Sequence, residues 1–236
     1  NTNSSTIPRE SDAVIYTHAG PEIAVASTKA LLTQIVATFL IGLHLGEVRG
    51  TLKSSEVSAI YNDMLELPAK LEQILETVEP LRELTRKFAG NNTVLFLGRH
   101  VGFPVALEGA LKLKELAYIH AEGFAGGELK HGPIALIEEG TPVIAIVPNT
   151  HEHGLDEKML SNIQEVRARG AKVIAIATEG IEIPGAAHTI RIPSTSQLLQ
   201  PVLATVPLQV FAYEMAVARG TDVDQPRNLA KSVTVE

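Results

Sequence analysis

The hydrophobic pattern of the chain changes at about residue 90. After that point, short runs that are apolar throughout alternate with stretches in which apolar residues recur at helical spacing. The runs predict strands at 93–97, 142–147, 172–177 and 188–192, and the stretches predict helices at 104–120, 156–169 and 201–219. Strands that are apolar on both faces belong to parallel sheets covered by helices on both sides. We therefore expect an α/β fold with a doubly wound parallel sheet.

Helical spacing dominates the first 90 residues. A short β-type run at 12–17 ends in turn residues, and a helix is predicted at 28–45, capped by the Ser-Thr pair at its start. That helix is apolar nearly all round, so we expect it to be internal. Further helices are predicted at 54–66 and, after the interruption at Pro68, at 69–88.

Composition and charge exclude several classes of protein. The 236 residues are 45% hydrophobic, which is enough for a sizeable core and excludes a disordered chain. Lysine and arginine number 20 against 27 aspartates and glutamates, so no basic stripe is available for nucleic acid. No cysteine occurs, which excludes disulfides and a cysteine nucleophile and fits a cytoplasmic protein. The apolar stretch at 30–45 contains Thr33, Gln34 and His44 and is too short to cross a membrane.

Three ionisable residues share one stripe of the helix predicted at 104–120. Glu108, Lys112 and Glu115 are spaced i, i+4 and i+7. Spacing alone favours an exposed ladder of ion pairs. The rest of this helix is mostly leucine and alanine, however, and leaves little solvated face. A carboxylate beside an ammonium in a partly dry cleft could have its pKa tuned for proton transfer. Both interpretations stay open on the residues alone.

Two histidine-containing segments and the C-terminal end carry further candidate chemistry. His131 lies in a stretch at 121–133 whose four glycines and proline predict neither helix nor strand. A lone histidine of this kind is more often structural or simply exposed. The His-Glu-His triplet at 151–153 has no third ligand nearby, so we interpret it as a solvated loop and expect no metal site. Residues 221–236 have the composition of a frayed tail, but several apolar side chains could anchor them.

Six segments along the chain resemble the isomerase half of the glutamine–fructose-6-phosphate aminotransferase family, the glucosamine-6-phosphate synthases. They are residues 9–12 (RESD), 25–30 (VASTKA), 106–115 (ALEGALKLKE), 127–133 (GELKHGP), 161–170 (SNIQEVRARG) and 222–236 (DVDQPRNLAKSVTVE). The central segments recur in sugar-isomerase (SIS) proteins generally. The last segment is much more specific to this family.

The resemblance implies two SIS subdomains, each with a five-stranded parallel sheet, in a homodimer. It implies an enzyme that converts fructose 6-phosphate and glutamine-derived ammonia into glucosamine 6-phosphate, without a metal or other cofactor. An N-terminal glutaminase domain, which needs an N-terminal cysteine absent here, would supply the ammonia. On this basis the chain divides into the remnant of a first subdomain (1–50), connecting helices (51–90), a second subdomain (91–219) and a tail that closes the active site (220–236).

The resemblance also assigns roles to individual residues. Glu115 would be the base that moves a proton between C1 and C2 of the sugar, and Lys112 would support the enol(amine) oxygen and the charge of Glu115. His131 would be the ring-opening acid/base and would reach the site of the partner subunit. Lys231 would form an imine with the open-chain ketose or hold its oxygen. Three further residues would line the pocket, the first two through the backbone: Val25, Ala230 and Ser27. These residue types suit ketose-to-aldose conversion, which needs a base and cations where oxyanion charge develops.

One motif of the family is missing. The Ser-Gln-Ser-Gly-x-Thr loop that holds the sugar phosphate does not occur in these residues, and we expect it upstream of Asn1. This chain alone is therefore expected to bind sugar phosphate weakly or not at all, and to show little isomerase activity. Without the preceding strands, the helix at 28–45 would expose apolar surface that dimerisation or rearrangement must cover.

Two other functions stay open. A fructosamine-6-phosphate deglycase would share Glu115 and His131 but act in the direction of breakdown, and the family-specific tail segment argues against it. A non-catalytic sensor would bind a sugar phosphate and regulate a partner. Such a sensor would not need the four ionisable residues named above to occur together.

Overall fold

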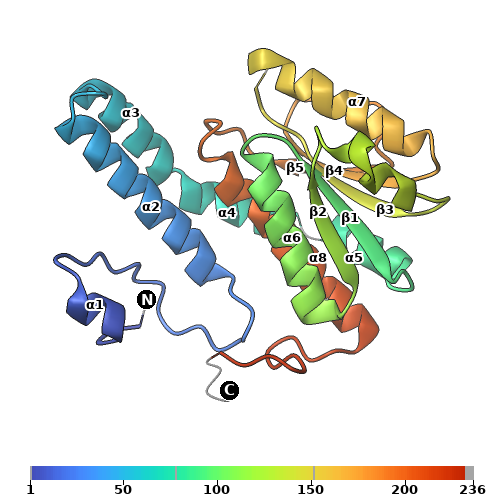
Figure 1. The fold of residues 1–236 in the computed structure, drawn as a ribbon, viewed down its shortest axis with the longest axis horizontal. Coiled ribbons are helices and arrows are strands. Elements are labelled where there is room, and N and C mark those ends of the chain that lie inside the picture. The colour runs from blue at the N-terminus through green and yellow to red at the C-terminus, as the bar shows by residue number, and fades with distance from the viewer. Residues whose placement is uncertain (1, 78, 151, 232–236) are drawn as a thin grey trace.

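The computed structural model describes residues 2–77, 79–150 and 152–231, and a parallel sheet forms its centre (Figure 1). The five strands are β1 (Thr93–Gly98), β2 (His120–Ala125), β3 (Pro142–Ile146), β4 (Lys172–Thr178) and β5 (His188–Ile192). Their order is β2-β1-β3-β4-β5, and every neighbouring pair is parallel. The chain places β2 on one side of β1 and β3 on the other, which is the doubly wound arrangement that the hydrophobic runs predict.

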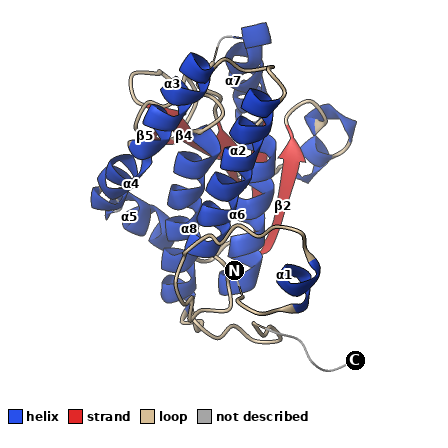
Figure 2. Cartoon of the chain, turned by 90° about the vertical axis from the view of Figure 1, so that its left-hand side faces the viewer, coloured by secondary structure: helices blue, strands red, loops and turns tan. Residues whose placement is uncertain are grey.

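Helices cover both faces of this sheet. α6 (Gly102–Ala117) and α8 (Gln200–Arg219) pack against one face, and α7 (Leu155–Arg167) packs against the other (Figures 1 and 2). α4 (Leu67–Glu76) and α5 (Glu79–Phe88) lie behind α8 as a further layer. Both faces of β1, β3 and β4 are therefore nearly dry, which explains why those runs are apolar at almost every position.

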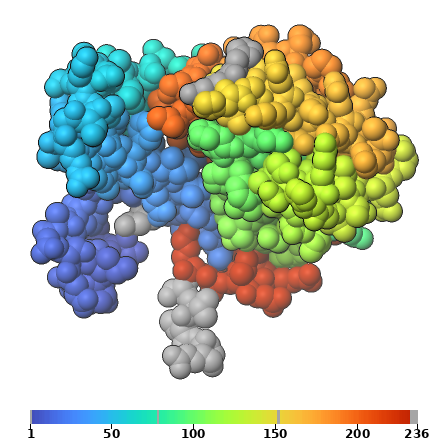
Figure 3. Space-filling view, turned by 45° about the horizontal axis from the view of Figure 1, so that its top comes forward, coloured from blue at the N-terminus to red at the C-terminus, as the bar shows by residue number. Residues whose placement is uncertain are grey.

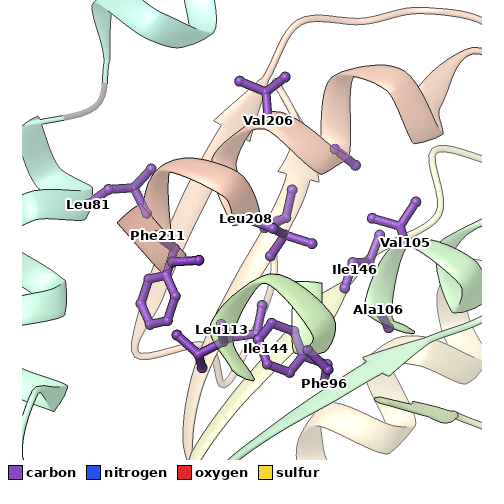
Figure 4. Close-up of a cluster of buried hydrophobic side chains, with 14 of the residues drawn as sticks. Leu81, Phe96, Val105, Ala106, Leu113, Ile144, Ile146, Val206, Leu208 and Phe211 are labelled. Carbon is purple, nitrogen blue, oxygen red and sulfur yellow. The ribbon is translucent and has the colours of Figure 1, made fainter. Parts of the chain in front are cut away.

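Alternation along the strands divides the core into two clusters. Phe96 and Ile144 point toward α6 and α8, where they meet Leu113 and Phe211 (Figure 4). The residues next to them along the strands, such as Leu95 and Val143, belong to the cluster under α7. This division follows from the two-residue period of a strand, in which successive side chains point to opposite faces.

The first part of the chain stands beside the sheet rather than inside it. α2 (Lys29–Val48) and α3 (Ser54–Leu65) pair with each other, and a short helix α1 (Thr6–Glu10) precedes them (Figure 1). Only Ala30 and Leu43 of α2 are buried. The prediction that this helix is internal is therefore wrong for the described residues: one side packs against the core through partly buried residues such as Leu32 and Phe39, while Leu40, Ile41, Leu45 and Val48 are exposed.

Two helices, α2 and α8, have the length and composition of a membrane span. Both have 20 residues, so the prediction that the apolar stretch in α2 is too short is wrong on length. Of the most apolar window, 67% is buried in α8 but only 6% in α2. α8 is thus the central core helix of the sheet domain, and α2 presents an apolar surface.

Three further predictions differ from the structure. Residues 12–17 form no strand: they have no regular secondary structure, and no strand among the described residues pairs with them. The helix predicted at 69–88 is divided into α4 and α5 around Thr77, and Val78 lies outside the described residues. α6 stops at Ala117 instead of continuing to residue 120, since Tyr118 adopts a left-handed conformation with φ 55°.

Strand β2 is the one strand of the described sheet that the sequence pattern misses. Its residues, HAEGFA, are mostly small or polar, and its edge position pairs it with β1 alone. Gly123 explains the composition, since a Cβ there would lie 2.9 Å from the backbone nitrogen of Leu107. The close approach of α6 therefore requires small residues in β2, and small residues weaken the strand signal.

Candidate active site

The stripe on α6 is a buried ion-pair cluster at the C-terminal half of that helix. Lys112 Nζ lies 2.5 Å from Glu115 Oε2 and 3.4 Å from Glu108 Oε1. The Lys112 side chain is only 3% exposed, and those of Glu108 and Glu115 are 17% and 21% exposed. The exposed-ladder interpretation is therefore wrong. The structure instead gives a carboxylate, Glu115, that is partly open to solvent and held by a buried ammonium.

Burial and two neighbouring charges shift the pKa of Glu108. Burial raises its pKa, the ammonium of Lys112 lowers it, and the charge of Glu115 raises it again, so that the net shift is upward. Glu108 Oε1 is buried and makes no hydrogen bond among the described residues, although it faces Lys112 as an ion pair. Two carboxylates thus compete for one ammonium, and Glu115 has the shorter contact.

Lys231 in the tail is held by the loop that leads into α2. Its Nζ donates to Glu22 Oε2 at 3.3 Å and to the carbonyl oxygen of Ala24 at 2.8 Å. The other oxygen of Glu22 accepts hydrogen bonds from the backbone N–H and the hydroxyl of Thr28, at 2.7 and 3.0 Å. It also accepts one from the N–H of Ala30 at 3.5 Å. Glu22 therefore caps α2 and binds the tail lysine with a single carboxylate.

Hydrogen bonds outweigh burial at Glu22. Its side chain is 7% exposed, and burial alone would raise its pKa. The donors from Thr28, Ala30 and Lys231 reverse that effect, so its pKa is lowered. The sequence predicts that Ser27 or Thr28 caps this helix with its own side chain. Neither does so, because the carboxylate takes that place at the positive end of the helix.

The tail also contacts the end of α6 where Glu115 lies. Thr221 Oγ1 donates to the carbonyl oxygen of Leu116 at 2.6 Å, and the N–H of Arg227 donates to the hydroxyl of Tyr118 at 2.7 Å. The Arg227 guanidinium lies 4.3 Å from the centroid of the same ring. In Figure 3 the tail, drawn in red, runs below α6, drawn in green, toward the blue N-terminal segment. The described part of the tail is thus anchored and not frayed.

One more hydrogen bond closes this arrangement. The N–H of Val25 donates to the carbonyl oxygen of Asp224 at 2.9 Å, which ties the 22–28 loop to the tail. Val25 and Ser27 are half-buried in that loop, and Ala230 and Lys231 are exposed in the tail. Three segments of the candidate site therefore meet at one end of the molecule, namely the end of α6, the 22–28 loop and residues 221–231.

His131 follows β2, whose last residues lie beside the start of α6 and so at the opposite end of that helix from Glu115. The N–H of Gly126, which follows β2, donates to the carbonyl oxygen of Gly98 at 2.8 Å, where β1 ends and α6 is about to begin. Glu115 comes 13 residues after Gly102, the first residue of α6. At 1.5 Å per residue the two ends are roughly 20 Å apart. Within one copy of the chain, His131 and Glu115 are therefore not brought together.

A family model settles which fold family this is, since the SIS domain model matches residues 87–219. The chain belongs to the SIS domain family. The match includes the whole of the parallel sheet, the ion-pair cluster on α6 and His131. The five-stranded parallel sheet expected from the resemblance is therefore confirmed.

Relatives of this SIS chain carry names in one enzyme class. The glutamine–fructose-6-phosphate aminotransferase (isomerizing) of Streptomyces coelicolor is 65% identical over 239 residues, and that of Corynebacterium diphtheriae is 62% identical over 240. Both comparisons cover 100% of this chain, but only 39% and 38% of those proteins. The chain thus spans about two fifths of the length of the curated relatives that it matches.

A solved structure agrees with those sequence relatives. The C-terminal domain of glucosamine–fructose-6-phosphate aminotransferase from Francisella tularensis superposes with a TM-score of 0.90 at 38% identity. The superposition covers 95% of this chain and 63% of that one. Because it covers nearly the whole chain, the superposition includes α2 and α3 as well as the SIS sheet.

Metal chemistry has no support in the described part of this SIS chain. No group of three or more His, Asp or Glu side chains able to hold a metal occurs among the residues that the structure describes. His151, the first residue of the triplet considered above, lies outside the described residues. The interpretation of that triplet as a solvated loop stays a prediction.

Two residues of this site escape sequence reasoning. Glu22 lies six residues before the helix end that it caps, outside the three-residue spacing of a capping box. Tyr118 lies just after α6, and its hydroxyl meets a segment more than 100 residues away. A positive φ at a non-glycine residue marks Tyr118 once coordinates exist, but no local pattern marks either residue beforehand.

Proposed function

We propose that this SIS domain is the sugar-isomerising part of an aminotransferase that makes glucosamine 6-phosphate from fructose 6-phosphate and glutamine-derived ammonia. The observation that carries the proposal is the buried Lys112 holding Glu115 at the end of α6, next to an anchored tail that carries Lys231. The names of the relatives support the same reaction. We further propose a cytoplasmic homodimer in which an N-terminal glutaminase domain supplies ammonia.

Glu115 is suited to move a proton between two neighbouring carbons. Its carboxylate is partly exposed, so a substrate can approach it, and the Lys112 ammonium fixes its direction. In the proposed reaction Glu115 takes a proton from C1 of the open-chain sugar and, as the conjugate acid, delivers a proton to C2. The charge that develops on the oxygen or nitrogen between these steps needs a nearby cation, and Lys112 is the closest one to Glu115.

Lys231 completes the site from the tail. Its ammonium is directed by Glu22 and Ala24 O, so the tail holds a positive charge over the 22–28 loop. In the proposed reaction Lys231 forms an imine with the ketose or holds its oxygen, while Val25, Ser27 and Ala230 line the pocket. A tail that covers the site also excludes water from the intermediate.

His131 enters the proposal through a second copy of the chain. Because the strand before it ends at the far end of α6 from Glu115, we do not expect it to serve the same site within one chain. We propose that His131 of one subunit opens the sugar ring in the site of its partner. A homodimer is then required for activity and not only for stability.

The proposal is tested in a full-length aminotransferase that carries these 236 residues as its C-terminal part. Glu115→Gln should lower the rate of glucosamine 6-phosphate formation by about 10³-fold, while fructose 6-phosphate still binds. Glu122→Gln, an exposed acid on β2, is the matched control and should behave like the parent. Unchanged turnover in Glu115→Gln with intact ligand binding would favour the sensor function. Turnover of fructosamine 6-phosphate in place of synthesis would favour the deglycase.

A further inference from the structure

Three consecutive residues of the 3₁₀ turn η1 (Leu129–His131) have three different environments. Leu129 is fully buried in the cluster under α7, Lys130 forms an ion pair with α7, and His131 is exposed. A 3₁₀ turn has three residues per turn, so successive side chains point about 120° apart. Fixing the directions of Leu129 and Lys130 therefore fixes the direction in which His131 leaves the surface.

The partner of Lys130 is Glu165, whose side chain is 21% exposed. Glu165 Oε1 lies 2.9 Å from Lys130 Nζ and accepts a hydrogen bond from Ser161 Oγ at 3.3 Å. Glu165 Oε2 accepts one from Asn162 Nδ2 at 3.4 Å. Burial raises the pKa of Glu165, but these donors outweigh burial and the pKa is lowered. The carboxylate is therefore ionised at neutral pH and available to Lys130.

A second set of contacts fixes the start of the turn. Arg99 Nε donates to Asn162 Oδ1 at 2.9 Å, and Asn162 is buried. Gly126, which leads into the turn, packs so closely on this pair that a Cβ would lie 2.7 Å from Asn162 Oδ1. The segment is thus fixed at Gly126 by the pair of Arg99 and Asn162, and again at Lys130 by Glu165.

We propose that Glu165, acting through Lys130, is a positioning residue that directs His131 away from its own chain and toward the site of a partner subunit. The inference rests on the proposed function, in which His131 opens the sugar ring in a second copy. Glu165 and Lys130 neutralise each other, and Leu129 takes up the core-facing position. The Lys130 side chain is 67% exposed, but its ammonium is paired with Glu165, so we assign contact with a second molecule to the exposed His131.

The test uses the full-length aminotransferase that carries these residues. Glu165→Gln removes the charge that holds Lys130, and Glu157→Gln, an exposed acid on the same helix, is its matched control. A double variant, Lys130→Glu with Glu165→Lys, restores the pair with its charges exchanged. We expect kcat for glucosamine 6-phosphate formation to fall about tenfold in Glu165→Gln, with little change in KM for fructose 6-phosphate. The exchanged pair should recover most of that loss, and Glu157→Gln should match the parent.

Hydrogen–deuterium exchange of residues 126–136 gives a readout that does not depend on turnover. Exchange should be faster in Glu165→Gln and return toward the parent in the exchanged pair. Equal rates and equal exchange in Glu165→Gln and Glu157→Gln would overturn the proposal. An exchanged pair that regains melting temperature but not kcat would also overturn it, since the pair would then be merely structural.

His131→Ala separates this inference from the proposed function. A large loss of kcat in His131→Ala, with none in Glu165→Gln, overturns the positioning role alone. A parent-like rate in His131→Ala overturns the ring-opening role of His131 and the positioning role together, and leaves the roles of Glu115 and Lys112 to be tested by their own variants.

Discussion

Lys231 Nζ lies 3.3 Å from Glu22 Oε2, although 209 residues separate them in the chain. The same carboxylate caps α2 through Thr28, so the position of the tail lysine depends on the start of a helix in the first part of the chain. This contact brings two of the three segments of the candidate site together, and the third, the end of α6, is tied to the tail by Thr221 and Tyr118. The geometry of the site is therefore a property of the whole chain.

Glu22→Gln should weaken both the helix cap and the hold on Lys231. An amide accepts hydrogen bonds less strongly than a carboxylate and carries no charge, so we expect a loss of about 1 kcal/mol in the free energy of unfolding. The pKa of Glu22 is lowered in the folded state, so its contribution is present above its ordinary value of 4.5 and is lost as pH falls through the lowered pKa. Urea unfolding at pH 7 and at acidic pH measures both effects.

The control for Glu22→Gln is Glu72→Gln, at an exposed position on α4. It should leave the unfolding midpoint unchanged within about 0.5 kcal/mol. If Glu22→Gln and Glu72→Gln had the same free energy of unfolding at every pH, the contact between Glu22 and Lys231 would contribute nothing to stability.

Lys112→Met should be strongly destabilising. The side chain is 3% exposed and lies between two carboxylates, so its removal leaves Glu108 and Glu115 without a cation. Breaking a buried pair of this kind costs roughly 3 kcal/mol, measured as the free energy of unfolding in urea. Lys114→Met, on the exposed side of the same helix, should cost far less. Equal losses in the two variants would contradict the description of Lys112 as a buried partner.

Glu108→Gln should change how stability depends on pH. Burial and the neighbouring Glu115 raise the pKa of Glu108 above its ordinary 4.5, despite Lys112. The folded state then binds this proton more tightly than the unfolded state, so the parent loses stability as pH rises from 4.5 through the raised pKa. The variant lacks this titration, so its free energy of unfolding should rise relative to that of the parent as pH rises from 4.5 through the raised pKa. A stability difference that is constant with pH would contradict the upward shift.

Tyr118→Phe tests the anchor of the tail. The variant keeps the aromatic ring that faces Arg227. It loses the hydroxyl that accepts a hydrogen bond from the backbone N–H of Arg227 at 2.7 Å. We expect faster hydrogen–deuterium exchange at residues 221–231 and a loss of about 1 kcal/mol. Tyr61→Phe, at a half-exposed ring on α3, is the control and should leave tail exchange unchanged. Parent-like exchange in Tyr118→Phe would show that other contacts hold the tail.

The sheet was predictable because burial on both faces leaves a direct trace in the sequence. β3 reads PVIAI and β4 reads KVIAIAT, and nearly every residue of both is buried. β2 was missed because Gly123 serves the approach of α6 and not the strand itself. Gly123 belongs to β2 but is in close contact with α6, and the contact with α6 decides which residue can stand there.

In the candidate site, contacts between residues near in sequence were predictable, and contacts between distant segments were not. Glu108, Lys112 and Glu115 share a helix, so spacing alone placed them together, and only their burial had to come from the structure. The link from Glu22 to Lys231 joins segments at opposite ends of the chain. No periodicity or motif in one segment specifies a partner in the other, so that relation needs coordinates.

Deuterium transfer from solvent tests the central claim most directly. In a full-length aminotransferase carrying this chain, turnover of fructose 6-phosphate in D₂O should place deuterium at C2 of the aminosugar, as read by NMR, because the base that accepts the C1 proton exchanges it with solvent before delivery. With Glu115→Gln and fructose 6-phosphate still bound, incorporation at C2 should fall to background, and Glu122→Gln should match the parent. Incorporation at the parent's rate in Glu115→Gln would show that another group moves the proton.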